Sequence, residues 1–224
     1  DAECAYWWAL QLSARTRAPA ARPLPAADVD LPGPLLRRFG AVINELGRLH
    51  LAAGELQVAE ARFKDSFAAF THTEDAPNKA LVLINFATVC RTRARRLRAT
   101  RVRRSEVSCA AGTEAAQTIS LPSAEEVEEL SNAVAQQRRA VEAIRPLRAS
   151  QPAFWEESLK QLADDESTLG DSLVTAARHS AATDVSVRQA AECLSRAQAL
   201  FEELGEAALV QLTMQRQGSL YLLP

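Results

Sequence analysis

The sequence has few of the residues that break helices or build sheets. Glycine occurs 8 times in 224 residues, and aromatic residues make up 5%. No stretch shows the sustained alternation of apolar and polar residues that marks a half-buried strand. No run of about 18 apolar residues occurs, so no membrane-spanning helix is expected in this sequence. Alanine, leucine and glutamate are abundant and favour helix, which predicts an all-α protein with no membrane partner.

Patterns typical of catalysis or metal binding are also missing. The cysteines form no Cys-x-x-Cys pair, and no nucleophile elbow, phosphate-binding glycine loop or His-Glu-x-x-His occurs. We therefore expect a protein that is not an enzyme and that has no cofactor, no metal and no small-molecule substrate. The residues 164–166 form an acidic triplet that we interpret as solvated surface. The scattered cysteines and histidines are Cys4, Cys90, Cys109, Cys193, His50, His72 and His179.

Apolar residues recur every three or four positions through most of the chain, as in amphipathic helices. After a helix over 2–16 and a proline-rich linker, we expect helices over about 35–53, 56–70, 76–104, 123–149, 153–180, 185–204 and 205–222. Ser123 and Glu126 form a capping box, and Pro146 is expected to kink or end the helix that follows. The predicted domains are an N-terminal helix and linker, 1–31, and a helical repeat domain, 32–224, with an arginine-rich insertion at about 92–122. The start at Asp1, inside an expected helix, indicates part of a longer protein.

The segment 40–73 has the spacing of a tetratricopeptide hairpin. In the first helix of such a hairpin, a Leu-Gly pair is followed by a position that usually holds an aromatic residue. In the second helix, a small residue, a large apolar residue and another small residue follow in turn. These positions are Leu46, Gly47, His50, Ala59, Phe63 and Ser66. Small residues are expected where two helix backbones cross, and the large one between hairpins. Two looser hairpins would pair the helix around Ala87 with Ala133 and Ala140, and the helix around Leu162 with Ala190, Leu194 and Ala197. The predicted fold is a right-handed α-α superhelix of such hairpins, with generic helical hairpins as the alternative.

The order of motifs in this region resembles the erythroid differentiation-related factor family. The resemblance covers about 35–222, is sharpest over 44–91, and has no counterpart for 92–122. It implies a nuclear protein linked to transcriptional regulation, with tetratricopeptide-type repeats as a binding surface and no catalytic residues to transfer. The matching positions are Asn44, Glu45, Leu46, Gly47, Asp75, Asn78, Ala80, Leu81, Asn85 and Arg91.

In a stack of such hairpins, the first helices line a concave face that receives an extended peptide or a helix. Counting from the small positions of the first two hairpins places Asn44, Arg48, Leu51, Thr88 and Arg91 on this face. The two arginines would bind a peptide backbone or carboxylate through charge-assisted hydrogen bonds. The alternative for Asn44 and Asn85 is that they cap or bridge neighbouring helices inside the stack.

Eight arginines fall between Arg91 and Arg104, although the net charge of the chain is only −2. Such a run is typical of a phosphate-binding segment or a nuclear import signal. The alternative is an exposed helix end, and no interleaved aromatic residues are present to stack on bases. Beyond Arg91, the residues concerned are Arg93, Arg95, Arg96, Arg98, Arg101, Arg103 and Arg104.

These features predict a non-enzymatic protein–protein interaction scaffold of tetratricopeptide-like repeats, with a peptide or helix of a protein partner in its concave groove. A nuclear transcription-regulatory assembly is the expected setting, and the cytoplasm is the other location considered. The rival hypotheses are a nucleic-acid-associated helical protein that uses the 91–104 run, and a structural subunit of a large complex.

Overall fold

The computed structural model describes residues 33–110, 121–179 and 184–222. The regular elements are the helices α2 (Gly33–Ala52), α3 (Leu56–His72), α4 (Ala76–Ala110), α6 (Ala124–Ile144), α7 (Pro152–His179), α8 (Asp184–Glu203) and α9 (Ala207–Gly218), and the short 3-10 helices η1 (Arg145–Leu147) and η2 (Ser219–Leu222). No strand occurs in these ranges, so the all-α prediction is confirmed. The predicted helix over 2–16 and its linker lie outside the described residues.

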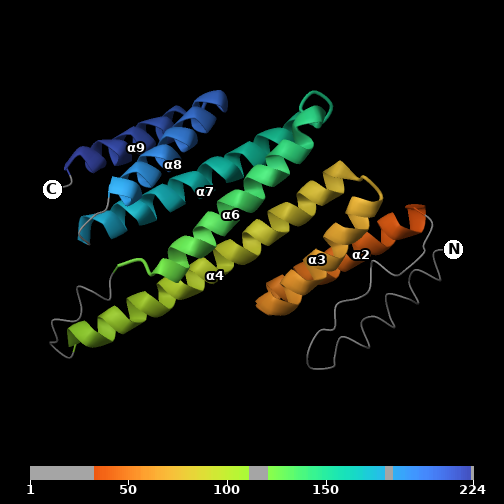
Figure 1. Ribbon diagram of the computed structural model, residues 1–224, viewed down its shortest axis with the longest axis horizontal. Helices are drawn as coiled ribbons and strands as arrows, with labels where there is room; N and C mark the ends of the chain where they lie inside the picture. The colour runs from red at the N-terminus through yellow and green to blue at the C-terminus, as the bar shows by residue number, and fades with distance from the viewer. Residues whose placement is uncertain (1–32, 111–120, 180–183, 223–224) are drawn as a thin grey trace.

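The helices lie side by side in chain order, each roughly antiparallel to the one before it (Figure 1). The closest pairs are α2 with α3, α4 with α6, and α7 with α8, so these pairs form three hairpins. Gly54 turns the chain between α2 and α3 with a φ of 80°, and Gly205 turns it between α8 and α9 with a φ of 73°. Both residues take the left-handed conformation that glycine adopts without a steric penalty.

The second helix of each hairpin buries three residues, and the spacing is the same in all three helices. The second buried residue comes four positions after the first, and the third comes three positions after the second. All nine side chains are 0% exposed: Ala59, Phe63 and Ser66 in α3, Ala133, Gln137 and Ala140 in α6, and Ala190, Leu194 and Ala197 in α8. Two glycines of first helices meet the large member of their own hairpin. A Cβ at Gly47 would lie 2.5 Å from the Phe63 ring, and one at Gly170 would lie 2.7 Å from Leu194 Cγ. The predicted close approach at Gly47 is confirmed.

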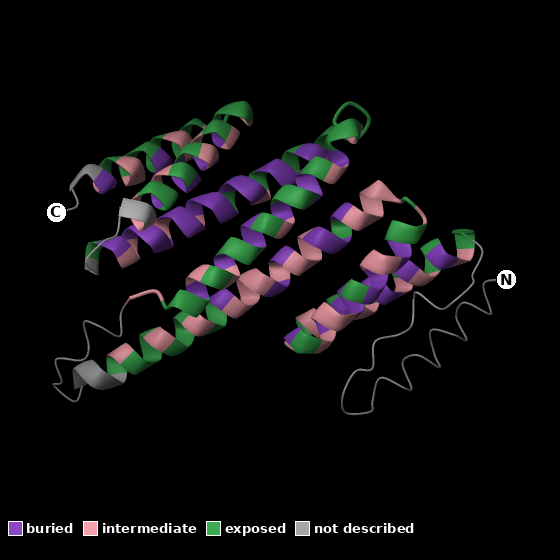
Figure 2. Cartoon of the chain, viewed as in Figure 1, coloured by how far each residue is buried: buried purple, intermediate pink, exposed green. Residues whose placement is uncertain are grey.

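The apolar core runs between the hairpins as well as within them. The largest cluster joins α4, α6, α7 and α8, and a second one joins α3 to α4. Buried positions accordingly follow a stripe on each helix, and α7 is buried along most of its length (Figure 2). Phe63 belongs to the α3–α4 cluster and packs edge-on against Phe86, with 5.8 Å between ring centroids. It therefore fills space between the first hairpin and the second, as predicted.

Most predicted helix ends are close to the observed ones, but α4 is longer than expected. It reaches Ala110 rather than Arg104, so residues 92–110 of the predicted insertion are continuous helix, while 111–120 lie outside the described residues. Half of the predicted capping box is confirmed, because the Glu126 backbone N–H donates to Ser123 Oγ at 3.1 Å, while the Glu126 carboxylate pairs with Arg98 and Arg101 of α4. Pro146 lies in η1, directly after the end of α6 at Ile144, so the predicted end of this helix is also confirmed.

Candidate protein-interaction grooves

Three arginines of the α4 run are engaged with carboxylates inside the molecule. Arg98 Nε donates to Glu126 Oε1 at 2.8 Å, and Arg101 Nε lies 3.3 Å from Glu126 Oε2. Arg93 reaches carboxylates on two helices, Glu60 of α3 and Glu129 of α6. The alternative that the run is simply an exposed helix end is therefore wrong for Arg93 and Arg101, which are half-buried, while Arg98 is exposed but paired with a buried carboxylate.

The remaining arginines of the run differ in their surroundings. Arg96 donates to the carbonyl oxygen of Gly54 at 3.0 Å and so braces the turn between α2 and α3. Arg95, Arg103 and Arg104 are exposed and form no ion pair with a described residue. A role of the run as a phosphate-binding or import segment stays a prediction, and these three residues are the ones available for it.

Glu126 is the residue that organises the C-terminal half of α4 against α6. Its side chain is fully buried, and a buried carboxylate is costly unless cations and hydrogen bonds surround it. Arg98 and Arg101 supply that environment from α4, and Arg98 also donates to Ser172 Oγ of α7 at 3.2 Å. One arginine thus connects three helices, in the part of α4 that follows its apolar half.

Glu166 plays the same part for α6, α7 and α8. Its carboxylate is 1% exposed and accepts hydrogen bonds from Arg138 Nε at 2.7 Å and Arg196 Nε at 3.2 Å. Asp165 is buried as well, whereas Asp164 is exposed. The interpretation of residues 164–166 as solvated surface is therefore wrong for Asp165 and Glu166, because both have arginine partners from other helices.

The first groove, called the α4–α7 groove, is a cavity of about 390 Å³ between these two helices. Its α4 wall carries Arg91, Arg95 and Arg98, and its α7 wall carries Asp164 and Asp165. Arg91 donates to Asp165 Oδ2 at 2.7 Å across the groove. This ion pair connects the second hairpin to the third. Arg95 lines the same groove and is exposed to solvent.

Carboxylates on the α7 wall hold protons more tightly than usual. Burial raises the pKa of Asp165 to about 6 despite the opposing effect of Arg91, with Asp164 and Glu166 adding to the rise. Burial also raises the pKa of Asp164. Gln161 completes this wall, and its Oε1 is buried without a hydrogen-bond partner among the described residues. The lining of the groove thus includes a buried acceptor whose hydrogen-bonding capacity is unused among the described residues.

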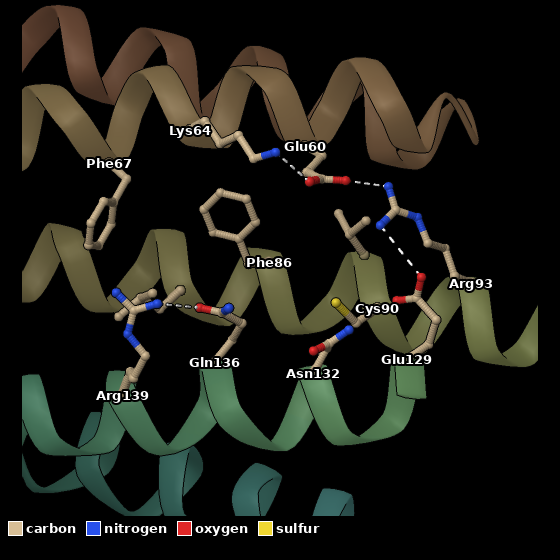
Figure 3. A pocket seen from close by; sticks show the side chains of 12 residues that line it. Glu60, Lys64, Phe67, Phe86, Cys90, Arg93, Glu129, Asn132, Gln136 and Arg139 are labelled. Atoms are coloured by element: carbon tan, nitrogen blue, oxygen red, sulfur yellow. Dashed lines mark hydrogen bonds and ion pairs between the residues drawn. The ribbon is translucent and has the colours of Figure 1, made fainter. Parts of the chain in front are cut away.

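The second groove, called the α3–α6 groove, is lined by a different stripe of α4 and has a volume of about 380 Å³. Leu83, Phe86 and Val89 of α4 provide its apolar lining, and α3 and α6 form its walls. Figure 3 shows Phe86 and Cys90 between these walls. Arg93 closes one end by reaching Glu60 and Glu129, so both walls are fixed to α4 there.

The other end of this groove is closed by Arg139, whose guanidinium lies 5.7 Å from the centroid of the Phe67 ring. Burial, followed by the nearby Glu129 carboxylate, raises the pKa of the Cys90 thiol to about 12. Burial raises the pKa of Glu60, but hydrogen bonds from Lys64 and Arg93 outweigh it and leave this pKa below its usual value. Cys90 is therefore a neutral, apolar part of the lining, while Glu60 stays charged.

The residues predicted to form one concave face have different environments. Asn44 is buried and accepts a hydrogen bond from Asn85 Nδ2 at 2.8 Å, so it bridges α2 and α4, which was the alternative considered for it. Leu51 is half-buried against the α3–α4 core cluster. Arg48 is exposed and pairs with Glu45 one turn earlier. Of the five residues, Arg91 lines the α4–α7 groove and Thr88 is hydrogen-bonded to Arg91.

Arg91 and Thr88 form a unit on α4. Arg91 lines the groove and donates from Nη2 to Thr88 Oγ1 at 2.7 Å, which holds the guanidinium toward Asp165. Arg91 was predicted to line a groove and does line this cavity, Arg95 was predicted only as part of the arginine run, and Gln161 and Thr168, which line the same cavity, were not predicted. No motif marks the last two residues, because their proximity to Arg91 depends on how α4 packs near α7.

A comparison with protein-family models, curated proteins and solved structures found no match to this chain. Within residues 33–110, 121–179 and 184–222, no group of three or more His, Cys, Asp or Glu side chains is placed to hold a metal ion. None of the helices in these same ranges combines the length and the apolar character needed to cross a bilayer.

Proposed function

We propose that this chain is a non-enzymatic protein–protein interaction module of tetratricopeptide-like repeats, stacked as a right-handed superhelix, which binds an extended acidic segment of a partner protein in the α4–α7 groove. The repeat assignment is supported by the three buried trios of α3, α6 and α8, which share one spacing. It is also supported by Gly47 and Gly170, which allow the first helix of a hairpin to approach the large residue of the second. Repeats of this kind commonly present grooves to partner segments.

The observation that carries the binding proposal is that one groove contains both an arginine without an ion-pair partner and a hydrogen-bond acceptor without a donor among the described residues. Arg95 is exposed and forms no ion pair with a described residue, so its guanidinium is available to a carboxylate. Gln161 Oε1 is buried without a donor among the described residues, and a rotation of this side chain into the groove would let it accept from a backbone N–H of an extended peptide. The charges on α4 attract an acidic segment, and Asp164 and Asp165 limit how far it enters toward α7.

The resemblance of residues 44–91 to the erythroid differentiation-related factor family supports a nuclear transcription-regulatory assembly as the setting. Asn44 and Asn85 belong to the shared positions, and their hydrogen bond joins two hairpins, which agrees with a packing role in a repeat. The engagement of Arg93, Arg98 and Arg101 with glutamates favours the scaffold over the rival proposal of nucleic-acid binding by the 91–104 run. Phosphate binding by these three would require breaking ion pairs to buried or half-buried carboxylates.

Binding is tested with a pool of fluorescein-labelled decapeptides that carry two fixed glutamates and random residues elsewhere. The 224-residue protein should raise their fluorescence anisotropy, and Arg95→Glu should weaken the selected peptides at least tenfold, about 1.4 kcal/mol. Arg103→Glu is the matched control, because it makes the same charge change at an exposed position of α4 that does not line the groove. Equal weakening by both substitutions, or no binding by the parent protein, contradicts the proposal.

A further inference from the structure

The α3–α6 groove continues beyond Arg93 into a larger cavity of about 690 Å³. The two cavities share Arg93 and Glu129, so the bridge between these side chains separates them without ending the groove. In the second cavity, Leu56 of α3 and Leu97 of α4 supply apolar surface. The result is one channel along a stripe of α4 that is separate from the α4–α7 groove, with two compartments in a row.

The channel follows continuous stripes of the three helices that form it. On α6, its lining begins at Glu125 and recurs every three or four residues to Arg139. These 14 steps correspond to about 21 Å of helix at 1.5 Å per residue. The channel is therefore as long as about four turns of a helix laid along it.

Opposite charges mark the two ends of the channel. At the end where α6 begins, Glu125 and Glu128 are exposed and form no ion pair with a described residue. Four glutamates and two arginines line that compartment in all. At the other end, Arg139 is exposed beside the apolar lining, whereas Lys64 points toward Glu60 and pairs with it (Figure 3). A partner that fits this surface has basic groups at one end and acidic groups at the other.

We propose that the channel docks an amphipathic α-helix of a partner protein, with a large apolar side chain in the compartment of Phe86 and basic side chains at Glu125 and Glu128. The centres of the two compartments lie about seven residues apart along α6, or about 10 Å, which is two turns of a helix. The partner therefore presents its apolar anchor at one position and its basic residues about seven positions away. Helices that bind grooves commonly use anchors at such spacings.

The depth of the first compartment favours a side-chain anchor. Its volume of about 380 Å³ is at the small end of cavities that hold ligands, and apolar atoms of Leu83, Phe86 and Val89 line it. The neutral Cys90 thiol adds to this apolar character. Asn132 and Gln136 on the α6 wall provide amide groups above the lining, where they would meet the polar flank of a docked helix.

The test uses two hydrocarbon-stapled, fluorescein-labelled helical peptides of 15 residues with the same composition. The first carries a phenylalanine at position 6, lysines seven and eight positions after it, and glutamates near its other end. The second has the lysines and glutamates exchanged. We expect the 224-residue protein to bind the first peptide at least tenfold more tightly than the second, because only the first matches the charges at both ends of the channel.

Two pairs of variants place the binding on the channel. Glu128→Lys should weaken the first peptide at least tenfold, and Glu142→Lys, an exposed glutamate of α6 outside the channel, should leave it unchanged. Asn132→Trp should obstruct the apolar compartment and weaken both peptides. Ser131→Trp, at the exposed neighbouring position that lines no part of the channel, should not.

A variant that loses stability could also lose binding, so the test includes a peptide whose charges are exchanged to match the Glu128→Lys variant. A peptide with glutamates in place of its two lysines should bind Glu128→Lys more tightly than it binds the parent protein. Equal affinity of the parent for both original peptides, or unchanged binding by Glu128→Lys and Asn132→Trp, overturns the proposal. Arg95→Glu should not affect the helical peptides, and Glu128→Lys should not affect the acidic decapeptides, so failure of one groove is distinguishable from failure of the other.

Discussion

Gly47 lies so close to Phe63 that a Cβ at this glycine would come within 2.5 Å of the ring. The same ring packs edge-on against Phe86 of α4. One glycine thus sets how closely α2 approaches α3, and the ring that it admits connects this hairpin to the lining of the α3–α6 groove. The packing of the first hairpin and the shape of the proposed docking channel are therefore linked through Phe63.

Gly47→Ala should lower the free energy of unfolding by about 2 kcal/mol, because a rigid ring and a helix backbone must move apart to admit the methyl group. Gly218→Ala is the matched control, since a Cβ at Gly218 meets nothing within 4 Å. Urea denaturation followed by circular dichroism measures both. Helix propensity alone would make the alanine the more stable residue in a helix, so a Gly47→Ala variant as stable as the parent would show that the contact with Phe63 does not determine the effect.

The fold class and most helix boundaries could be predicted because they depend on local signals. Ser123 with Glu126 marks the start of α6, and Gly54 marks the turn between α2 and α3. The third hairpin also contained a signal that the sequence analysis missed. Leu169 and Gly170 form a second Leu-Gly pair, and Gly170 packs against Leu194 as Gly47 packs against Phe63. The longer connection from Gly170 to the second helix concealed this repeat.

Glu126→Gln should destabilise the protein by about 3 kcal/mol, because it leaves Arg98 and Arg101 without their buried counter-charge. We expect the lower end of the usual range for such a change, since the Arg98 side chain is 46% exposed and water can compensate part of the loss. Glu125→Gln, one residue earlier and exposed, should change the free energy of unfolding by less than about 0.5 kcal/mol. Chemical denaturation of both variants at pH 7 provides the comparison.

The contacts of the arginine run could not be predicted from its composition. The sequence of an arginine run or an acidic triplet is the same whether its side chains face solvent or pair with other charged side chains inside the protein. The difference arises because α6 places Glu126 beside Arg98, and α7 places Asp165 beside Arg91, across 28 and 74 residues of chain. Asn44 was misplaced for the same reason, since its partner Asn85 belongs to another hairpin.

Cys90 should be unreactive toward iodoacetamide at pH 8 in the folded protein, because a thiol with a pKa of about 12 is almost entirely protonated there. Cys193 should behave likewise, as burial and the Glu166 carboxylate raise its pKa to about 11. Both should alkylate rapidly in urea, and mass spectrometry of the peptides measures the rates. Fast labelling of Cys90 before unfolding would mean that the lining of the α3–α6 groove is more polar than its packing indicates.

Asp165 should make the stability of the protein depend on pH in a direction unusual for a paired carboxylate. Its pKa in the folded protein is raised from 3.8 to about 6, mainly by burial. Between these two values the folded state binds the proton and the unfolded state does not, so the free energy of unfolding falls as pH rises from about 4 to 6. A shift of about two units corresponds to roughly 3 kcal/mol.

Asp165→Asn isolates this contribution, because an amide has no proton to exchange in this range. The free energy of unfolding of the parent minus that of the variant should be larger at pH 4 than at pH 7, by roughly 3 kcal/mol. The loss of the ion pair with Arg91 shifts the whole difference but not its slope between pH 4 and 6. Urea titrations at half-unit intervals measure the slope. A difference that grows with rising pH would mean that Arg91 outweighs burial, and that the α7 wall of the α4–α7 groove carries its full negative charge well below pH 6.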